Sequence, residues 1–318
     1  MRNIKYLTLA MLCSFCSASV AEPREVIKYA TENENTRKFI EDFSREGVYS
    51  RSELNSIFSK TVLKEKKISK RQNNQAEKKL TWADYKSRVV TMIRLSAGKA
   101  FLYENRQILQ DIENKYNVDK EVIVAILGVE TNYGYNKGDF RAIDALSTLA
   151  FEYYPRSDFF KKELKEFLKY SKKNNLTPFD TKSSWAGAVG YPQFIPSSIN
   201  HYGVDYDGDG KVDLVNSLPD AMASVANYLS KSGFKKGDYY FDKITVDNKH
   251  VGTGLKLTQS CIKTDLKLHD RYCNNNFKIF KLDDEQYIAS KNFYAVTMYN
   301  RSNLYASAVL EIAKSLKN

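Results

Sequence analysis

Glu130 is the residue whose type and position most directly suggest catalysis. It follows Val122 by eight positions and Ile126 by four, so on a helix it lies on the same face as apolar side chains. Apolar surroundings and the negative end of a helix dipole both disfavour a carboxylate. We therefore expect Glu130 to be protonated near neutral pH and able to act as the general acid in cleaving a glycosidic bond. The alternative is a helix-end glutamate bonded to a neighbouring arginine or backbone amide.

Residues 183–198, Ser-Ser-Trp-Ala-Gly-Ala-Val-Gly-Tyr-Pro-Gln-Phe-Ile-Pro-Ser-Ser, form a second candidate region. Small residues let the backbone approach a ligand closely, and Ser184 and Gln193 offer neutral groups that can orient sugar hydroxyls and amides. The same pattern also fits tight helix–helix packing around Gly187 and Gly190. The residues alone leave both interpretations open.

The third candidate, residues 205–213, matches the spacing of a calcium-binding loop. Carboxylates fill positions one, three, five and nine, glycine fills position six, and Lys211 offers a backbone carbonyl at position seven. Position twelve is Asn216 where a bidentate glutamate is usual, and Asp220 lies four residues further on. The spacing predicts weak or structural calcium binding, with a surface turn that holds no metal as the alternative.

Other chemistries lack their residues in this sequence. The three histidines, His201, His250 and His269, are scattered, and there is no HExxH, zinc-type Cys/His spacing, GxGxxG or P-loop. These absences argue against metalloproteases and nucleotide-dependent enzymes.

The elements that must position these residues are mostly helices. Apolar spacing predicts helices within residues 22–60, 82–116, from Asp119 through Glu130, within 221–229 and within 302–316. A capping box at residues 50–53 marks one helix start. The basic run at 64–79 is typical of a solvated loop. Short β-branched stretches in 241–296, such as 244–246 and 277–280, predict a small strand-rich insertion.

The N-terminus has the pattern of a cleaved secretory signal. Arg2 and Lys5 precede an apolar run, and residues 17–21 are mostly small, which favours a cut after Ala21. The apolar run is short for a membrane anchor, which is the alternative, and no small residue directly precedes Cys13 or Cys16. We therefore predict a soluble periplasmic protein without a lipoprotein anchor and without a transmembrane segment.

Export bears on the two cysteines outside the signal. Cys261 and Cys273 would then lie in an oxidising compartment, where a bridge closing so short a loop contributes about 3 kcal/mol. We predict that disulfide, with two reduced thiols as the alternative.

Composition sets the broad class. The 318 residues allow about two domains, and the hydrophobic fraction of 42% with only 14 Gly and 6 Pro is ordinary for a globular protein. The net charge of +11 and the 22 tyrosines suggest a polyanionic or carbohydrate partner. Export and the lack of a recognition motif argue against nucleic acid.

Four separated motifs together resemble the lytic murein transglycosylases of the B type, glycoside hydrolase family 103. They are residues 128–134 (Gly-Val-Glu-Thr-Asn-Tyr-Gly), 184–198, 205–213 and 292–300 (Asn-Phe-Tyr-Ala-Val-Thr-Met-Tyr-Asn), and the similarity runs from about Thr36 to the C-terminus. The resemblance implies a mainly α (α+β) fold: a lysozyme-like catalytic core, flanking helical segments, an EF-hand-like calcium loop and a small strand-rich C-terminal insertion.

The resemblance also implies the reaction. The bond between N-acetylmuramic acid and N-acetylglucosamine is cleaved without water, leaving a 1,6-anhydromuramoyl end, with Glu130 as acid and then as base. One catalytic glutamate is enough, unlike in the two-carboxylate hydrolases. Other cell-wall enzymes are expected as further partners beside the peptidoglycan strands. A hydrolytic muramidase and a catalytically silent wall-binding protein remain the alternatives.

Site residues carry over from the family by position. Ser184 and Gln193 resemble residues that contact the substrate, and Arg156 resembles a basic residue available to peptide-stem carboxylates. Residues that resemble the lining of the sugar cleft are Tyr85, Tyr228, Tyr299, Asn300 and Tyr305. The implied calcium ligands are Asp205, Asp207, Asp209, Lys211 through its carbonyl, and Asp220, of which Asp220 departs most from the family spacing. Pro192 stands where the family usually has glycine.

These observations predict five parts of the chain: a signal peptide at 1–21, an N-terminal helical segment and basic linker at 22–80, a catalytic core at 81–235 with the calcium loop at 205–220, a strand-rich subdomain at 236–296, and a C-terminal helix at 297–318.

Overall fold

The computed structural model describes residues 28–64, 67–68, 80–152, 154–237, 241–252 and 277–317. The predicted signal sequence, most of the basic run, and Cys261 and Cys273 lie outside these residues, so those predictions stay as they are. Within the described ranges, no helix has both the length and the hydropathy that crossing a membrane requires.

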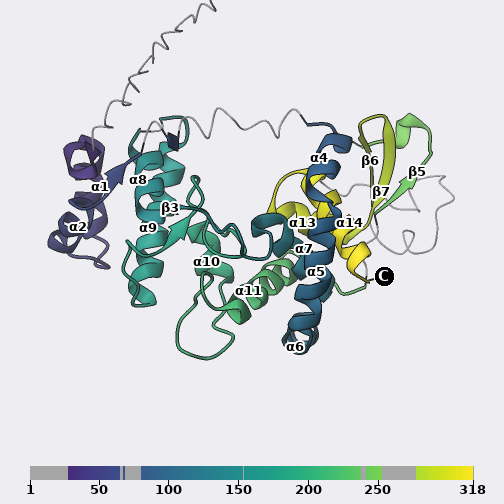
Figure 1. The fold of residues 1–318 in the computed structure, drawn as a ribbon. Coiled ribbons are helices and arrows are strands. Elements are labelled where there is room, and N and C mark those ends of the chain that lie inside the picture. Colours follow the sequence, from purple (N-terminus) through teal and green to yellow (C-terminus); the bar gives the residue numbers. More distant parts are fainter. Residues whose placement is uncertain are drawn as a thin grey trace, which may run out of the picture.

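Helices dominate the described chain (Figure 1). Their bounds are α1 Glu34–Ser44, α2 Arg51–Phe58, α4 Trp82–Val89, α5 Met92–Glu104, α6 Arg106–Tyr116, α7 Lys120–Thr131, α8 Ala142–Glu152, α9 Ser157–Lys173, α10 Pro196–Tyr202, α11 Leu218–Lys231, α13 Lys291–Tyr299 and α14 Asn303–Lys317, with 3-10 turns η1 Ala30–Glu32, η3 Tyr154–Arg156 and η4 Asn248–His250. The strands are short: β1 Lys28–Tyr29, β2 Val62–Leu63, β3 Phe140–Arg141, β4 Lys182–Ser183, β5 Phe241–Ile244, β6 Lys278–Leu282 and β7 Glu285–Ala289.

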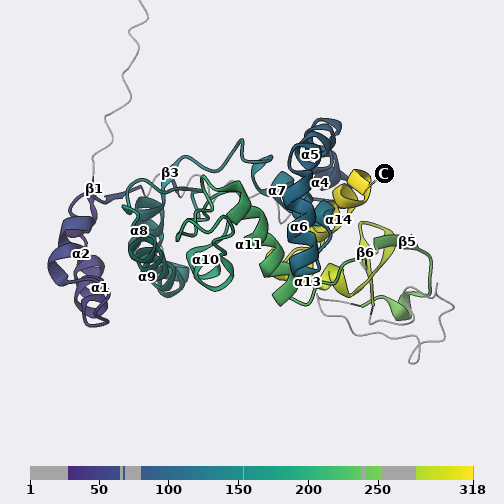
Figure 2. The ribbon, with the colours of Figure 1, turned by 90° about the horizontal axis from the view of Figure 1, so that it is seen from below.

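The apolar side chains collect in two main clusters, which divide the molecule along its length. The N-terminal cluster joins α1 and α2 to α8 and α9, and aromatic rings such as Phe39, Phe58 and Phe151 meet there edge to face. The antiparallel pairs β1–β2 and β3–β4 lie beside it. In Figures 1 and 2 these elements occupy one end of an elongated molecule, with α10 and α11 between them and the rest.

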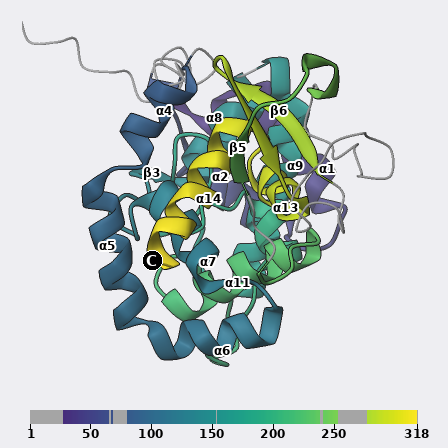
Figure 3. The same cartoon turned by 90° about the vertical axis from the view of Figure 1, so that its right-hand side faces the viewer.

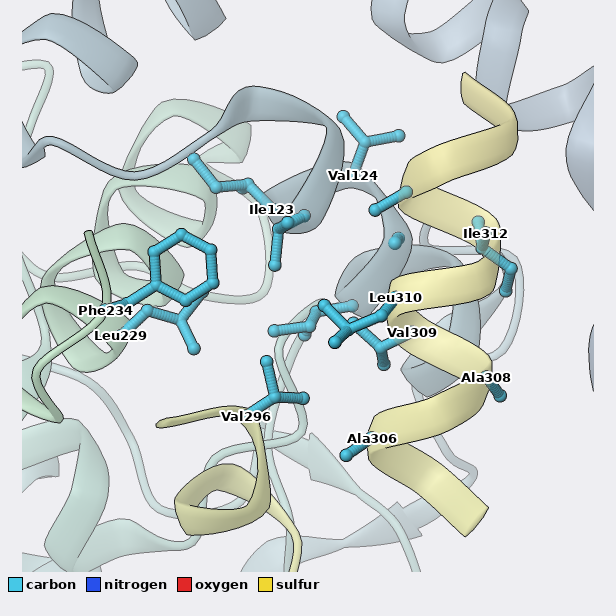
Figure 4. Close-up of a cluster of buried hydrophobic side chains, with 14 of the residues drawn as sticks. Ile123, Val124, Leu229, Phe234, Val296, Ala306, Ala308, Val309, Leu310 and Ile312 are labelled. Atoms are coloured by element: carbon cyan, nitrogen blue, oxygen red, sulfur yellow. The ribbon is translucent and has the colours of Figure 1, made fainter. Parts of the chain in front are cut away.

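The C-terminal cluster is built around α7 and α14. Ile123 and Val124 of α7 face Val309, Leu310 and other apolar residues of α14, and Leu229, Phe234 and Val296 close the cluster (Figure 4). Helix α7 is almost wholly buried, because the six consecutive residues 122–127 are all apolar. A helix that is apolar all round must be enclosed by other elements. This enclosure fixes the helix that carries Glu130.

A three-stranded antiparallel sheet in the order β5-β7-β6 lies against α14, with β5 in contact with that helix. Figure 3 shows this sheet next to α14, with α4, α5 and α6 following one another around the edge of the same region. The rings of Phe241, Phe280 and Phe293 pack together where the sheet meets α13. The predicted strand-rich insertion therefore packs onto the helices that flank the site.

Most predicted elements are confirmed. The capping box joins Ser50 and Glu53, the helix from Asp119 ends just after Glu130, and 277–280 enters β6. The 82–116 span is three helices, because the chain turns at Val90 and at Asn105. The 244–246 stretch contributes only Ile244 to a strand.

The predicted domain boundaries stay a prediction. Most buried apolar residues within 142–214 belong to the N-terminal cluster with α1 and α2, whereas Tyr191, Val204 and Tyr206 pack against the C-terminal cluster. The 296/297 boundary falls inside α13. Local composition reports where polar linkers lie, whereas these units are set by contacts between segments distant in the sequence.

Candidate active site

Glu130 sits in the last turn of α7, at a partly exposed position. The helix starts after Asp119, the N-cap residue, and ends at Asn132, which has the left-handed backbone conformation (φ 50°) common at helix C-termini. Since the preceding turns of α7 are buried, the carboxyl group stands where a rigid apolar helix reaches solvent.

The residues around Glu130 hold this helix end in place. Tyr133 also has positive φ (60°), and its ring folds back over Gly128, where a Cβ atom would come within 2.6 Å of the ring. Its hydroxyl donates to the Arg94 carbonyl on α5 at 3.0 Å. Thr131 donates to the Tyr191 carbonyl at 3.1 Å. Residues 128–134 therefore form a compact turn that ties α7 to α5 and to the segment bearing Gln193.

Tyr305 of α14 donates a hydrogen bond from its hydroxyl to Oε1 of Glu130 at 2.7 Å. Tyr305 is 2% exposed, and burial together with the nearby Glu130 raises its pKa well above the usual value. The phenol therefore stays protonated and remains a donor. A hydrogen bond donated to a carboxylate favours the ionised form, so this contact acts against the predicted protonation of Glu130, which the apolar neighbours favour.

Tyrosine and phenylalanine rings extend from Tyr305 into the adjoining cavity. Tyr299 lies parallel to Tyr305, with ring centroids 6.3 Å apart, and Tyr228 and Phe194 pack on Tyr299. The Tyr299 hydroxyl donates to the Pro192 carbonyl and the Tyr228 hydroxyl to the Met298 carbonyl. Burial raises the pKa of Tyr228 to about 12. These phenols are fixed hydrogen-bonding groups and not acids or bases.

A cavity of about 570 Å³ opens beside this tyrosine group. Among the described residues that line it are five of the predicted substrate-binding residues: Arg156, Gln193, Tyr228, Tyr299 and Asn300. Glu130 is not one of its lining residues, and is linked to it through Tyr305 and Tyr299. The structure thus brings most of the predicted site together from α7, α11, α13, α14 and the 184–198 segment.

Gln193 and Ser184 lie on one tight double turn. Gln193 has a positive φ (49°), unusual for this residue type, and its Nε2 donates to the Gly190 carbonyl at 2.9 Å. Ser184 Oγ accepts from the Ala188 amide at 3.1 Å, so this hydroxyl supports the turn. A Cβ atom on Gly190 would lie 2.1 Å from the Leu214 carbonyl, so this glycine packs closely against another backbone segment and not against a helix.

Tyr85 lies further in than we expected from sequence. It is 8% exposed in α4, within the C-terminal cluster. Several contributors were not singled out from the sequence: Tyr133, Tyr191, Phe194 and Arg301. The glycines at 128 and 134 were the available signal, since both mark positions where a tyrosine ring covers the backbone.

The 205–213 loop brings three of its carboxylates close together. Oxygens of Asp205, Asp207 and Asp209 lie within 4.8 Å of one another. Gly208 and Gly210 both have positive φ (76° and 87°), which allows the sharp turn between them. Three converging carboxylates suit a calcium ion, which prefers oxygen ligands.

Asp220 has a different position from these three. It is 1% exposed at the start of α11, and its carboxylate accepts from the backbone amides of Tyr206 and Asp213 at 2.8 and 2.9 Å. These two hydrogen bonds from the loop backbone to the buried Asp220 carboxylate fix the conformation of the loop. Asp213, at position nine, turns its Oδ1 to the amides of Val215 and Asn216.

Comparisons with known proteins identify relatives over most of the chain. A family model described as Transglycosylase SLT domain matches residues 31–314. The membrane-bound lytic murein transglycosylase B of Escherichia coli K12 is 31% identical over 301 residues, which cover 89% of this chain and 83% of that protein.

Solved structures of such enzymes share the fold. The soluble lytic transglycosylase SltB1 of Pseudomonas aeruginosa is 33% identical, with a TM-score of 0.81 over 88% of this chain and 97% of that chain. Escherichia coli Slt35 in complex with calcium is 30% identical, with a TM-score of 0.79 over 90% and 93%. Pseudomonas aeruginosa SltB3 in complex with NAG-anhNAM-pentapeptide is 27% identical, with a TM-score of 0.75 over 90% and 80%.

Proposed function

Because the chain belongs to the transglycosylase SLT family and is a lytic transglycosylase that acts on peptidoglycan, we propose that Glu130 is its catalytic acid and base. The predicted mainly helical, lysozyme-like fold and the family resemblance are confirmed by the same comparisons. The observation that carries the proposal is the placement of Glu130 at the end of a buried helix, bonded to Tyr305 and next to an aromatic cavity.

The reaction needs one carboxyl group in two protonation states. Protonated Glu130 gives its proton to the oxygen that links N-acetylmuramic acid to N-acetylglucosamine, and the bond from that oxygen to the anomeric carbon breaks. The resulting carboxylate then accepts the proton of the muramoyl 6-hydroxyl, whose oxygen bonds to the anomeric carbon. The product carries a 1,6-anhydro ring, no water is consumed, and Glu130 ends protonated as it began.

The neighbouring groups support this cycle. Tyr305 donates to Glu130 and so stabilises the carboxylate formed midway. An apolar helix end favours the protonated state at the start, so the two influences together keep both states accessible. Gln193, Asn300, Tyr228 and Tyr299 present neutral polar groups and rings along the cavity, as sugar hydroxyls, acetamides and sugar faces require.

The first test compares the wild-type protein with Glu130→Gln on purified peptidoglycan sacculi. We expect the wild type to release fragments that are one water lighter than hydrolysis products, and Glu130→Gln to lose at least about a thousandfold in rate. Glu104→Gln, an exposed glutamate on α5, is the matched control and should keep full activity. Sustained release of anhydro fragments by Glu130→Gln would reject the assignment.

We also propose that the 205–213 loop binds one calcium ion in a structural role. Asp205, Asp207 and Asp209 would supply carboxylate oxygens and Lys211 its backbone carbonyl. The calcium complex of the related Slt35 supports this proposal. Asp220 would contribute by ordering the loop amides, and its oxygens could also bind the ion, because a carboxylate oxygen that accepts one amide keeps a second lone pair.

Location and partners stay predictions. The expected periplasmic export rests on residues 1–21, which are outside the described ranges. The Escherichia coli relative is described as membrane-bound, which gives no support to our expectation that lipid anchoring is absent. Peptidoglycan strands are the proposed partner, with other cell-wall enzymes as expected further ones.

A further inference from the structure

The cavity beside the tyrosine group carries two arginines, and only one of them was singled out from the sequence. Arg156 precedes α9, and Arg301 lies in the short turn between α13 and α14. Both line the cavity. Among the described residues that line it, none is acidic, so the guanidinium groups give the cavity a positive charge that its own walls do not neutralise.

Arg156 is held by aromatic rings. Its guanidinium carbon lies 4.3 Å from the ring centroid of Phe159 and 5.3 Å from that of Phe160. Such stacking uses the faces of the guanidinium and leaves its edge N–H groups available. Within the described part of the chain, this side chain forms no ion pair.

Arg301 lies in a hydrogen-bonded turn. The Ser302 amide donates to the Asn300 carbonyl at 2.7 Å, and the Ser302 hydroxyl accepts from the Tyr305 amide. Arg301 lines the same cavity as Tyr228 and Tyr299. Arg301 also has no ion pair among the described residues.

We propose that Arg301 is a specificity residue that, together with Arg156, binds carboxylates of the peptide stem on the muramoyl sugar. This inference rests on the proposed function. Planar guanidinium groups pair with carboxylates through two parallel hydrogen bonds, which a neutral sugar cannot offer. Because Arg301 shares its turn with Asn300 and precedes Tyr305 by four residues, a bound stem carboxylate would lie close to the segment that reaches Glu130.

The test compares three substrates: glycan strands with peptide stems, the same strands after an amidase has removed the stems, and stem-bearing strands whose carboxylates have been amidated. We expect the wild type to have the lowest KM on the first. Arg301→Gln should raise that KM about tenfold, as the loss of one charge-assisted contact implies, with kcat nearly unchanged. The other two substrates should respond little to this variant.

Two further variants complete the design. Arg301→Lys keeps the positive charge without the planar guanidinium and should recover part of the lower KM for stem-bearing strands. Arg51→Gln changes an exposed arginine at the start of α2 and should leave that KM unchanged. Equal losses by Arg301→Gln on all three substrates, or no loss on any, would overturn the inference. If the wild type makes no anhydro product from any strand, the proposed function itself fails, which is a separate outcome.

Discussion

At the scale of single residues, the bond between Tyr305 and Glu130 joins two parts of the chain that are 175 residues apart. It gives the carboxyl group a fixed orientation and a permanent donor. The apolar face of α7 favours the protonated acid, while the phenol favours the carboxylate. A residue that must be acid in one step and base in the next benefits from this balance.

The variant Tyr305→Phe tests this balance. Removing the donor should raise the pKa of Glu130, because the carboxylate loses a stabilising bond while the protonated form loses less. The alkaline limb of the kcat/KM profile should therefore move to higher pH, and the maximum should fall about tenfold. Profiles of Tyr305→Phe and wild type that superimpose would show that the hydroxyl does not act on Glu130.

The sequence made Glu130 a candidate by its type and place on an apolar helix face, and the family resemblance supplied the other candidate residues; the structure brings most of them together, and their roles stay proposals. The sequence did not reveal the Tyr305 donor to Glu130, since contacts over 175 residues leave no local pattern. The sequence also gave no reason to single out Arg301, because a lone arginine in a turn cannot be distinguished by pattern from an ordinary surface charge.

At the scale of elements, the position of the C-terminal end of α7 depends on the Tyr133 ring, which occupies the space that a side chain at Gly128 would fill. Gly128 and Gly98 face each other across the Tyr133 ring and hydroxyl, and a Cβ on either would lie within 2.6 Å of them. Helix α7 can approach α5 closely only because both positions are glycine. The position of Glu130 follows from this close approach.

Gly128→Ala should therefore destabilise the protein, although alanine is favoured over glycine in a helix by about 1 kcal/mol. Overpacking against Tyr133 costs about 1–3 kcal/mol and should outweigh that preference. Urea unfolding measures the effect. In a Tyr133→Ala background the clash is absent, and Gly128→Ala should then be stabilising. Destabilisation of the same size in both backgrounds would contradict the packing account.

The calcium loop gives a second prediction for an element. At a hundredfold excess over the dissociation constant, calcium should add about 2.7 kcal/mol to the free energy of unfolding, and a chelator should remove it. Thermal unfolding with and without calcium measures this. Asp209→Asn should abolish the response, while Asp139→Asn, an exposed carboxylate outside the loop, should keep it. A wild-type midpoint that ignores both calcium and chelator would refute the site.

Element positions were largely predictable. The capping box at Ser50 and the apolar stripe of α7 are local signals, and the structure contains both. The breaks at Val90 and Asn105 were missed, because helical apolar spacing resumes after each of them. Local signals were present: the Thr91 side chain caps α5, and residues 104–107 are all polar.

At the scale of the whole molecule, the two main apolar clusters meet near the proposed site. Tyr299 packs against both clusters. The part of the cavity wall that Tyr299 forms therefore lies where the two clusters meet. The predicted partition of the chain stays a prediction, because it rests on local composition, which does not report the long-range packing that forms the two clusters. The net charge of +11 supplies general attraction to an anionic wall, while the site supplies selectivity.

The central claim is that Glu130 directs an internal hydroxyl, and not water, onto the anomeric carbon. The most direct measurement is digestion of sacculi by the wild-type protein in water labelled with heavy oxygen, followed by mass spectrometry of the fragments. We predict fragments with anhydro ends and without heavy oxygen at the cleaved carbon, formed by the wild type and not by Glu130→Gln. Fragments with heavy oxygen at that carbon would show hydrolysis and contradict the account.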